Sequence, residues 1–431
     1  MPLMQMKPFR AEIVAIGSEL LHGGRVDSNS LFIAEMLANC GMKVAKKVAV
    51  SDELRDIQSV LRLSAKQANV VVMTGGLGST VDDVTREAVA DTFSRPLTVR
   101  RKAMQILKRQ IQSRGRIVTP LLARQALIPR GAKVLDNHVG TAPGFYVQEG
   151  QAHVFVVPGV PREAREMMEC QVQPILKRKL RANAILWTHA FNTMGLTETD
   201  IQRLVSPLIQ KSSAIALGLL ASTKGVKVTL TCWRAKNQKL TQSLKLKNFP
   251  EGDFLIKKVR KALEPWLFSE GEKTMEEIVG QLCSSHKWRL ALAESCTGGL
   301  IAHRLTEVPG SSAYLDRGVV TYSNKAKQEL LGVSPTTLRK YGAVSAEVAE
   351  SMAKGIREKS RVNLGVSVTG IAGPGGGSAK KPVGLVFMAI DGPKGCQSQR
   401  CQFWGDRAEI KFRSSQSALN MIRRYVLRAK A

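Results

Sequence analysis

A serine at the end of one apolar segment is the first candidate for chemistry in this chain. Residues 290–293 form an apolar run that predicts a buried strand, and Ser295 follows in a glycine-containing turn that leads into an amphipathic stretch. Strand, turn and helix in this order place a hydroxyl at the carboxyl edge of a sheet, beside the free N–H groups that open a helix. Such N–H groups stabilise a developing oxyanion or bind an anion. Ser295 is therefore a candidate nucleophile, provided that a base lies nearby.

Candidate bases follow the next predicted strand. Residues 318–321 form a second strand-like segment, and Tyr322 and Lys327 come after it; a third, residues 365–369, ends at Thr369 and runs into a glycine-rich loop. Ligands of open α/β sheets bind at the carboxyl ends of the strands, so these side chains are expected at one edge. Lysine accepts a proton when burial or a nearby cation lowers its pKa. Tyr322 could relay the proton, and the sequence leaves open which of the two takes it first.

Simpler structural roles compete with this chemistry. A serine before a helix commonly serves only as an N-cap, and glycines with proline commonly indicate only a turn. Lys325 and Lys327 alone would ordinarily be solvated surface lysines. Cys296 is the rival nucleophile, because a thiolate is intrinsically stronger, and its bland alternative is a packed small side chain. Polar residues at the ends of three successive predicted strands together favour an active site over these structural roles.

These motifs together resemble the C-terminal domain of the CinA family, the competence/damage-inducible proteins, in its nicotinamide-nucleotide amidohydrolase form. The matching text within roughly residues 272–424 is AESCTGG, VVTYSN-x-x-K, GAVS, SVTGIAGPGG, KPVG and F-x-G-D-R, in family order. The resemblance implies that a serine attacks the carboxamide of nicotinamide mononucleotide (NMN) and releases ammonia and nicotinate mononucleotide, with no cofactor. It implies Ser295 as the nucleophile and Tyr322 with Lys327 as the activating pair. It also implies that substrate contacts come from Thr297, Gly298, Gly299, Asn324, Thr369, Gly370, Gly373 and Arg407.

One departure from the family pattern bears on the base. Lys325 stands where an acidic residue is common, and an added cation there is expected to lower the pKa of Lys327. Partial burial and the substrate pyridinium are the other expected causes of a lowered pKa.

The first part of the chain alternates strand-like and helix-like segments, which predicts a mostly parallel sheet with helices on both faces. The expected strands are residues 11–16, 43–48, 70–73 and 154–157, and the expected helices are residues 29–39, 54–68 and 85–92. The strand at 70–73 ends in a candidate phosphate-binding loop at Thr74, Gly75, Gly76 and Gly78, whose three glycines let N–H groups approach phosphates. Asp82 and Asp83 are candidate ligands of a divalent metal such as Mg²⁺, with helix N-terminal capping as the alternative.

This half is similar to the N-terminal domain of the same family, which resembles molybdopterin-binding enzymes. The matching text is AIGSELL-x-G, TGGLGST-x-DD-x-T, GTAPGF and PGVPRE. In some members the domain hydrolyses ADP-ribose with a divalent metal, and a bound metal would activate water for attack on the pyrophosphate. Because the fold also occurs in binding modules, an ADP-ribose pyrophosphatase and a binding module both stay open for this half.

The expected fold class is α/β, with two three-layer α/β/α domains joined by a small α+β domain. We place the boundaries at residues 1–175, 176–268 and 269–431. The middle segment carries a helix at residues 198–210 and an alternating strand at 226–232, and its lysine-rich run at 235–249 is expected to be a loop. A homodimer is expected.

Composition raises a second hypothesis about partners. The chain has 64 Lys and Arg against 35 Asp and Glu, a net charge of +29 that suits a nucleic-acid-binding protein without catalysis. Against this, aromatic residues are only 5% and no helix-turn-helix, zinc-finger or RNA-recognition signature is visible. The same charge would steer anionic nucleotide substrates. Seven scattered cysteines fit a reducing cytoplasm, and no apolar run reaches the length of a membrane span, so no membrane partner is expected.

Overall fold

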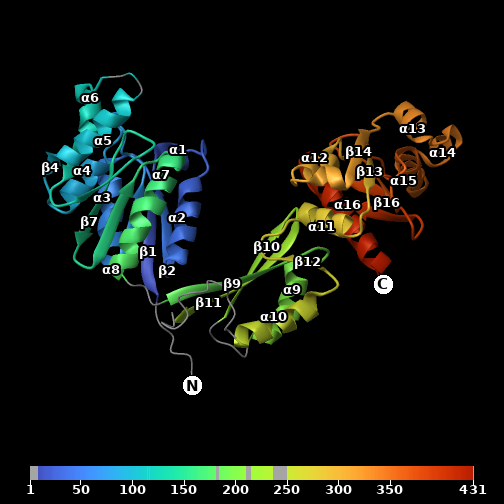
Figure 1. Ribbon diagram of the computed structural model, residues 1–431, viewed down its shortest axis with the longest axis horizontal. Coiled ribbons are helices and arrows are strands. Elements are labelled where there is room, and N and C mark those ends of the chain that lie inside the picture. The colour runs from blue at the N-terminus through green and yellow to red at the C-terminus, as the bar shows by residue number, and fades with distance from the viewer. Residues whose placement is uncertain are drawn as a thin grey trace. The chain divides into compact units, whose positions relative to one another are not determined.

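The structure is a computed structural model of the 431-residue chain and describes residues 8–113, 115, 117–180, 184–209, 215–235 and 250–430 (Figure 1). By its internal contacts the chain divides into two compact units. The first comprises Met1–Trp187 and Cys232–Lys247, and the second comprises Thr188–Thr231 and Asn248–Ala431. Apart from residue 235, the predicted lysine-rich loop lies outside the described residues. The three domain boundaries therefore stay a prediction.

A six-stranded sheet of order β2-β1-β3-β8-β7-β6 forms the centre of the first unit. Its parallel strands are β1 (Phe9–Ile16), β2 (Met42–Val50), β3 (Val70–Thr74) and β8 (Ala152–Val157). Two strands outside the prediction extend one edge antiparallel, β7 (Gly144–Glu149) and β6 (Lys133–Leu135). The buried apolar strands were visible in the sequence because a parallel sheet covered on both faces needs continuous apolar runs.

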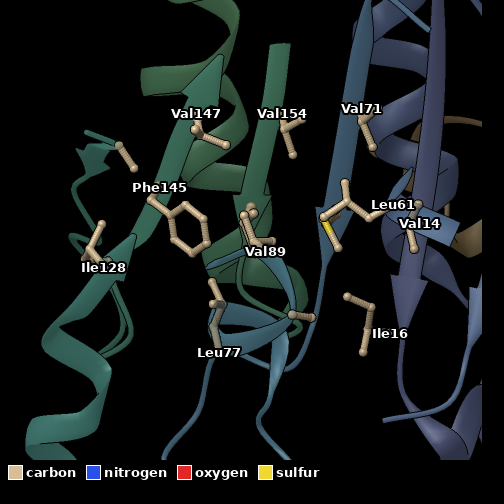
Figure 2. Close-up of a cluster of buried hydrophobic side chains, with 14 of the residues drawn as sticks. Val14, Ile16, Leu61, Val71, Leu77, Val89, Ile128, Phe145, Val147 and Val154 are labelled. Carbon is tan, nitrogen blue, oxygen red and sulfur yellow. The ribbon is translucent and has the colours of Figure 1, made fainter. Parts of the chain in front are cut away.

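Helices cover both faces of this sheet, which confirms the expected layers. One core gathers α3 (Leu54–Gln67), α4 (Thr85–Thr92) and α5 (Arg101–Gln112), and Figure 2 shows part of it, with Val14 and Val71 beside Leu61. The opposite core gathers α2 (Ser28–Asn39), α7 (Pro161–Met167) and α8 (Gln173–Leu180). Adjacent strand residues divide between the two cores, since successive side chains of a strand point to opposite faces. Other short elements of this unit include α1 (Ser18–Leu21), β4 (Leu97–Val99), α6 (Pro120–Ala123) and β5 (Leu127–Pro129).

A four-stranded sheet of order β10-β11-β9-β12 belongs mostly to the second unit. Its strands are β9 (Ala184–Thr193), β10 (Ala216–Ser222), β11 (Gly225–Ala235) and β12 (Leu267–Glu270). Two helices accompany it, α9 (Glu198–Ile209) and α10 (Pro250–Leu263), and they pack on each other. This composition agrees with the small α+β region expected there.

The C-terminal part of the second unit is a five-stranded sheet of order β14-β13-β15-β16-β17. The strands β13 (Leu290–Glu294), β14 (Leu315–Val320) and β15 (Leu364–Gly370) are parallel, whereas β16 (Leu385–Asp391) and β17 (Gln397–Gln402) are antiparallel. One core joins the sheet to α11 (Met275–Ser285), α12 (Leu300–Thr306) and α16 (Arg407–Lys430). The other joins it to α13 (Asn324–Leu331), α14 (Pro335–Tyr341) and α15 (Ala346–Ser360). The carboxyl ends of the three parallel strands therefore meet at one edge.

Candidate active site

The turn after β13 holds Ser295 between the two neighbouring strands. The Ser295 N–H donates to the Val368 carbonyl at 3.0 Å, and the Gly298 N–H donates back to the Ser295 carbonyl at 3.1 Å. Gly298 and Gly299 have φ angles of +63° and +90°, a left-handed conformation that glycine adopts without strain. The tight turn leaves the Ser295 side chain 8% exposed at the sheet edge.

Lys327 reaches the Ser295 hydroxyl from the first turns of α13. Ser323 caps this helix by accepting from the Ala326 N–H at 3.0 Å, which sets the helix start. The Lys327 side chain is only 1% exposed; its Nζ lies 3.1 Å from Ser295 Oγ and 2.7 Å from the Thr321 carbonyl oxygen. Burial lowers the pKa of Lys327, and nearby Cys296 offsets this only in part. A lysine with a lowered pKa, within hydrogen-bond reach of a serine, can act as its general base.

Lys325 lies too far into solvent to have the predicted effect on Lys327. Its side chain is 82% exposed, and its Nζ lies 3.7 Å from Glu329, one helical turn further along α13. Burial, and not the charge at 325, is the cause of the lowered pKa of Lys327. The prediction that Lys325 lowers the pKa of Lys327 is wrong. Residues two positions apart on a helix are rotated by roughly 200° about its axis, so only one of the two lysines can face the sheet.

Tyr322 lies at the rim of the site and contacts Arg407. It is 64% exposed, and its hydroxyl accepts from Arg407 Nη2 at 3.0 Å. Arg407, at the start of α16, also donates through Nη1 to the Gly373 carbonyl at 2.6 Å. The arginine thus joins the strand end at Tyr322 to the glycine-rich loop. Asn324, the first residue of α13, is exposed beside them.

The two threonines expected to contact substrate are buried. Thr369 donates its hydroxyl to the Ala343 carbonyl at 2.8 Å and so holds the segment that precedes α15. Thr297 is fully buried in the turn, and its hydroxyl has no hydrogen-bond partner among the described residues. Gly370 packs against the Leu385 carbonyl, where a β-carbon would be crowded. These residues shape the loops around the site.

Cys296 is a poor nucleophile in this position. Its side chain is buried and belongs to the apolar core under α12. Burial raises the pKa of the thiol to about 12, and nearby backbone N–H groups lower it only in part. Because the thiolate is the reactive form, a thiol that stays protonated supports the packed-side-chain alternative for Cys296 and favours Ser295.

The N–H groups that open α12 are not free, contrary to the expectation from the sequence. Glu294, the last residue of β13, is 1% exposed and accepts from the N–H groups of Gly299 at 3.0 Å, Ile301 at 3.1 Å and Ala302 at 2.9 Å. The N–H of Leu300 donates to the Thr297 carbonyl at 3.4 Å. The carboxylate takes the place that the predicted oxyanion would have occupied.

In the first unit, the glycines at the end of β3 are required by close packing. A β-carbon on Gly75 would collide with the Ile16 carbonyl oxygen, and one on Gly76 would collide with the Thr85 hydroxyl. The Gly75 N–H donates to the Val157 carbonyl, and the Gly78 N–H donates to Asp83 at 2.7 Å. Two of the three N–H groups expected to face phosphate are therefore already bonded within the protein. Thr74 is buried and donates its hydroxyl to the Pro158 carbonyl at 2.9 Å.

The aspartate pair does not form a metal cage. Asp83 accepts from the Gly78 N–H through Oδ1 and from the Thr80 N–H and hydroxyl, at 2.8 and 2.5 Å, through Oδ2; Asp82 is exposed. Among the described residues, no three His, Cys, Asp or Glu side chains gather as metal ligands. Asp83 instead stabilises the loop before α4 by accepting hydrogen bonds from loop residues, a structural role similar to the N-terminal capping that the sequence offered as the alternative to metal binding. The divalent metal stays a prediction.

Comparisons with known proteins bear on the whole chain. The family described as "CinA C-terminal domain" matches residues 272–426, and the family "Probable molybdopterin binding domain" matches residues 12–178. A CinA-like protein of Geotalea daltonii is 40% identical over 418 residues, covering 97% of this chain and 99% of that protein. This chain belongs to the CinA family. A CinA-like protein of Geotalea uraniireducens is 37% identical over 414 residues, covering 96% and 97% of the two chains.

A solved structure is also similar to part of this chain. The competence/damage-inducible protein of Agrobacterium tumefaciens is 47% identical over 34% of this chain and 92% of its own, with a TM-score of 0.33. Family membership confirms the resemblance drawn from the motifs and the α/β fold. The two Geotalea relatives are named only as CinA-like proteins and the solved structure only as a competence/damage-inducible protein, and none of these names specifies a reaction.

Three residues of this CinA-family chain were missed by sequence reasoning. Glu294 and Lys411 lie at the turn that carries Ser295; the Lys411 ammonium is 3.5 Å from the place of a β-carbon on Gly298. Arg86 is buried in the N-terminal unit and donates to the carbonyls of Leu77 and Gly78 at 2.8 and 2.6 Å. A charged residue that directly ends or follows a buried apolar run was the available signal for Glu294, because an acidic side chain there can cap the next helix.

Within the described residues, no helix combines the length and the apolar character needed to cross a bilayer.

Proposed function

We propose that the chain is an amidohydrolase that converts NMN and water to nicotinate mononucleotide and ammonia. The observation that carries the proposal is the buried side-chain nitrogen of Lys327 at 3.1 Å from the Ser295 hydroxyl. A serine at a strand–helix turn beside a lysine of lowered pKa supplies the nucleophile and the base that an acyl-transfer enzyme needs. CinA-family membership adds the motif match within which this pair lies.

The residues would act in two steps. Neutral Lys327 takes the proton of Ser295 as the oxygen attacks the carboxamide carbon, and the resulting ammonium returns that proton to the nitrogen that leaves as ammonia. The nicotinoyl ester on Ser295 is then attacked by water, whose proton passes to Lys327 and on to Ser295 as the ester bond breaks. The Thr321 carbonyl, 2.7 Å from Nζ, keeps the lysine directed at the turn through both steps. The lysine thus alternates between base and acid.

Tyr322 and Arg407 suit substrate contact better than proton transfer. The tyrosine hydroxyl accepts from Arg407 and is largely exposed, whereas Lys327 reaches Ser295 directly. This supports Lys327 as the primary base. The cations of Arg407 and Lys411, on successive turns of α16, suit the phosphate of a mononucleotide.

We assign no second reaction to the N-terminal unit. Both oxygens of Asp83 are bonded to the loop, and no specific feature of the described residues favours pyrophosphate cleavage. ADP-ribose pyrophosphatase activity stays a prediction, as do nucleic-acid binding, a homodimer and a cytoplasmic location.

Ammonia release tests the proposal. Purified chain should release ammonia from NMN in step with formation of nicotinate mononucleotide, and Ser295→Ala should not. A chain without NMN turnover that shifts with duplex DNA or RNA at near-physiological salt would replace the proposal with the nucleic-acid alternative.

A further inference from the structure

A buried carboxylate closes the catalytic turn from behind. Glu294 is adjacent to Ser295 in the chain, yet its side chain crosses to the start of α12, where three N–H groups converge on it. Oε2 accepts from Gly299 and Ile301, and Oε1 accepts from Ala302. The backbone of Glu294 is held as well, because the Thr321 N–H donates to its carbonyl at 2.7 Å.

No other side chain of the described residues caps the start of α12. Its N-cap residue is Gly299, which carries no side chain, so the orphan N–H groups of the first turn depend on Glu294. An anion at this end is also favoured by the helix dipole. The Glu294 carboxylate therefore links the end of β13 to the start of α12, on either side of the four turn residues 295–298.

We propose that Glu294 is a positioning residue for the reaction at Ser295: it holds the turn so that the serine hydroxyl stays within reach of Lys327. The inference rests on the proposed function. Glu294 does not touch the reacting atoms; it acts through the backbone of residues 299–302. Its charge serves a second purpose at Cys296, where, after burial, it is among the causes that keep the thiol protonated.

The decisive variant is Glu294→Gln. An amide of the same shape offers one accepting oxygen, and its NH₂ group must face at least one of the three backbone donors. We expect kcat for NMN to fall about 100-fold with KM changed little, because misplacement by about 1 Å costs on that order while substrate contacts at Arg407 remain. Amide hydrogen exchange at residues 299–302 should become faster. Glu294→Asp, which keeps the charge but shortens the reach, should lose activity in the same direction and serves if the glutamine variant does not fold.

A matched control is a carboxylate of α11 that binds the opposite end of α12. Glu276 is a mostly buried carboxylate whose Oε1 accepts from Arg304 Nε at 2.6 Å, in the last turn of α12. Glu276→Gln should lower the melting temperature while leaving kcat and exchange at residues 299–302 near the wild-type values. Loss of kcat equal to that of Glu294→Gln would reduce the role of Glu294 to stability and overturn the inference.

The outcomes separate this inference from the proposed function. A wild-type chain that does not deamidate NMN refutes the function and, with it, the catalytic role of Glu294. An active wild type whose Glu294→Gln variant keeps its kcat, or keeps its slow exchange, refutes the inference alone.

Discussion

Replacing Lys327 tests whether a neutral amine is the base. The wild-type amine lies 3.1 Å from Ser295 Oγ, inside the reach of about 2.6–3.2 Å that a general base needs. Arginine keeps the positive charge but does not lose its proton at working pH, so Lys327→Arg should fail almost as completely as Lys327→Ala. General-base catalysis contributes about 10²–10⁴ in rate, which corresponds to about 3–5 kcal/mol of transition-state stabilisation. We expect kcat/KM losses in that range for both variants.

The pH dependence carries the same prediction. Burial holds the pKa of Lys327 below its usual 10.5, so the active amine fraction grows as the pH rises through the lowered value. The wild-type kcat/KM should therefore rise with pH up to the lowered pKa, which lies below 10.5, and level off above it. Lys327→Ala should lose this limb, and small primary amines, which fit the space left by a buried lysine side chain, should restore part of the rate.

The assay is ammonia release from NMN between pH 6 and 10, roughly the span over which a lowered lysine pKa titrates. Lys325→Ala is the control: its side chain is 82% exposed and points to Glu329, so its rate should stay within about twofold of wild type. An active Lys327→Arg enzyme, or an unchanged pH limb in Lys327→Ala, would refute the lysine base and move Tyr322 forward.

Three further outcomes are expected. Ser295→Ala should lose several orders of magnitude in ammonia release, whereas Cys296→Ala should stay within a few-fold, because burial raises the pKa of that thiol to about 12; rapid inactivation by iodoacetamide would contradict this. NMN deamidation by the full chain should be unchanged by a chelator, since a lysine supplies the base, and lost turnover that returns with added Mg²⁺ would count against the mechanism. Arg86→Met should lower the free energy of unfolding of the N-terminal unit in urea by about 3 kcal/mol, because two buried carbonyls lose a charged donor, while NMN turnover persists; an unchanged unfolding midpoint would show that these bonds contribute nothing.

The sequence by itself determined the elements and the place of the candidate nucleophile. Apolar runs such as residues 290–293 and 70–73 are local features, and a strand covered on both faces has no other pattern. The position of Ser295 at a strand end followed from its neighbours in the chain. The family motifs pointed to the same edge of the sheet. The antiparallel edge strands were missed although their partners are near in the chain, because β6 has only three residues and β17 is polar and largely exposed, so neither carries a long apolar run.

Only the tertiary structure decided which polar side chains meet. Lys325 and Lys327 have the same chemistry and nearly the same place in the sequence, but the start of α13 turns one to solvent and buries the other against Ser295. Tyr322 was the expected partner of Lys327, but its hydroxyl contacts Arg407, which begins α16 and lies 85 positions later in the chain. In the sequence Glu294 is simply the last residue of a strand. In the fold, its carboxylate accepts from the N–H groups at the start of α12, which the sequence predicted to be free for an oxyanion. Side-chain direction depends on helix phase and on packing between distant segments, and these are set only when the whole sheet has assembled around its helices.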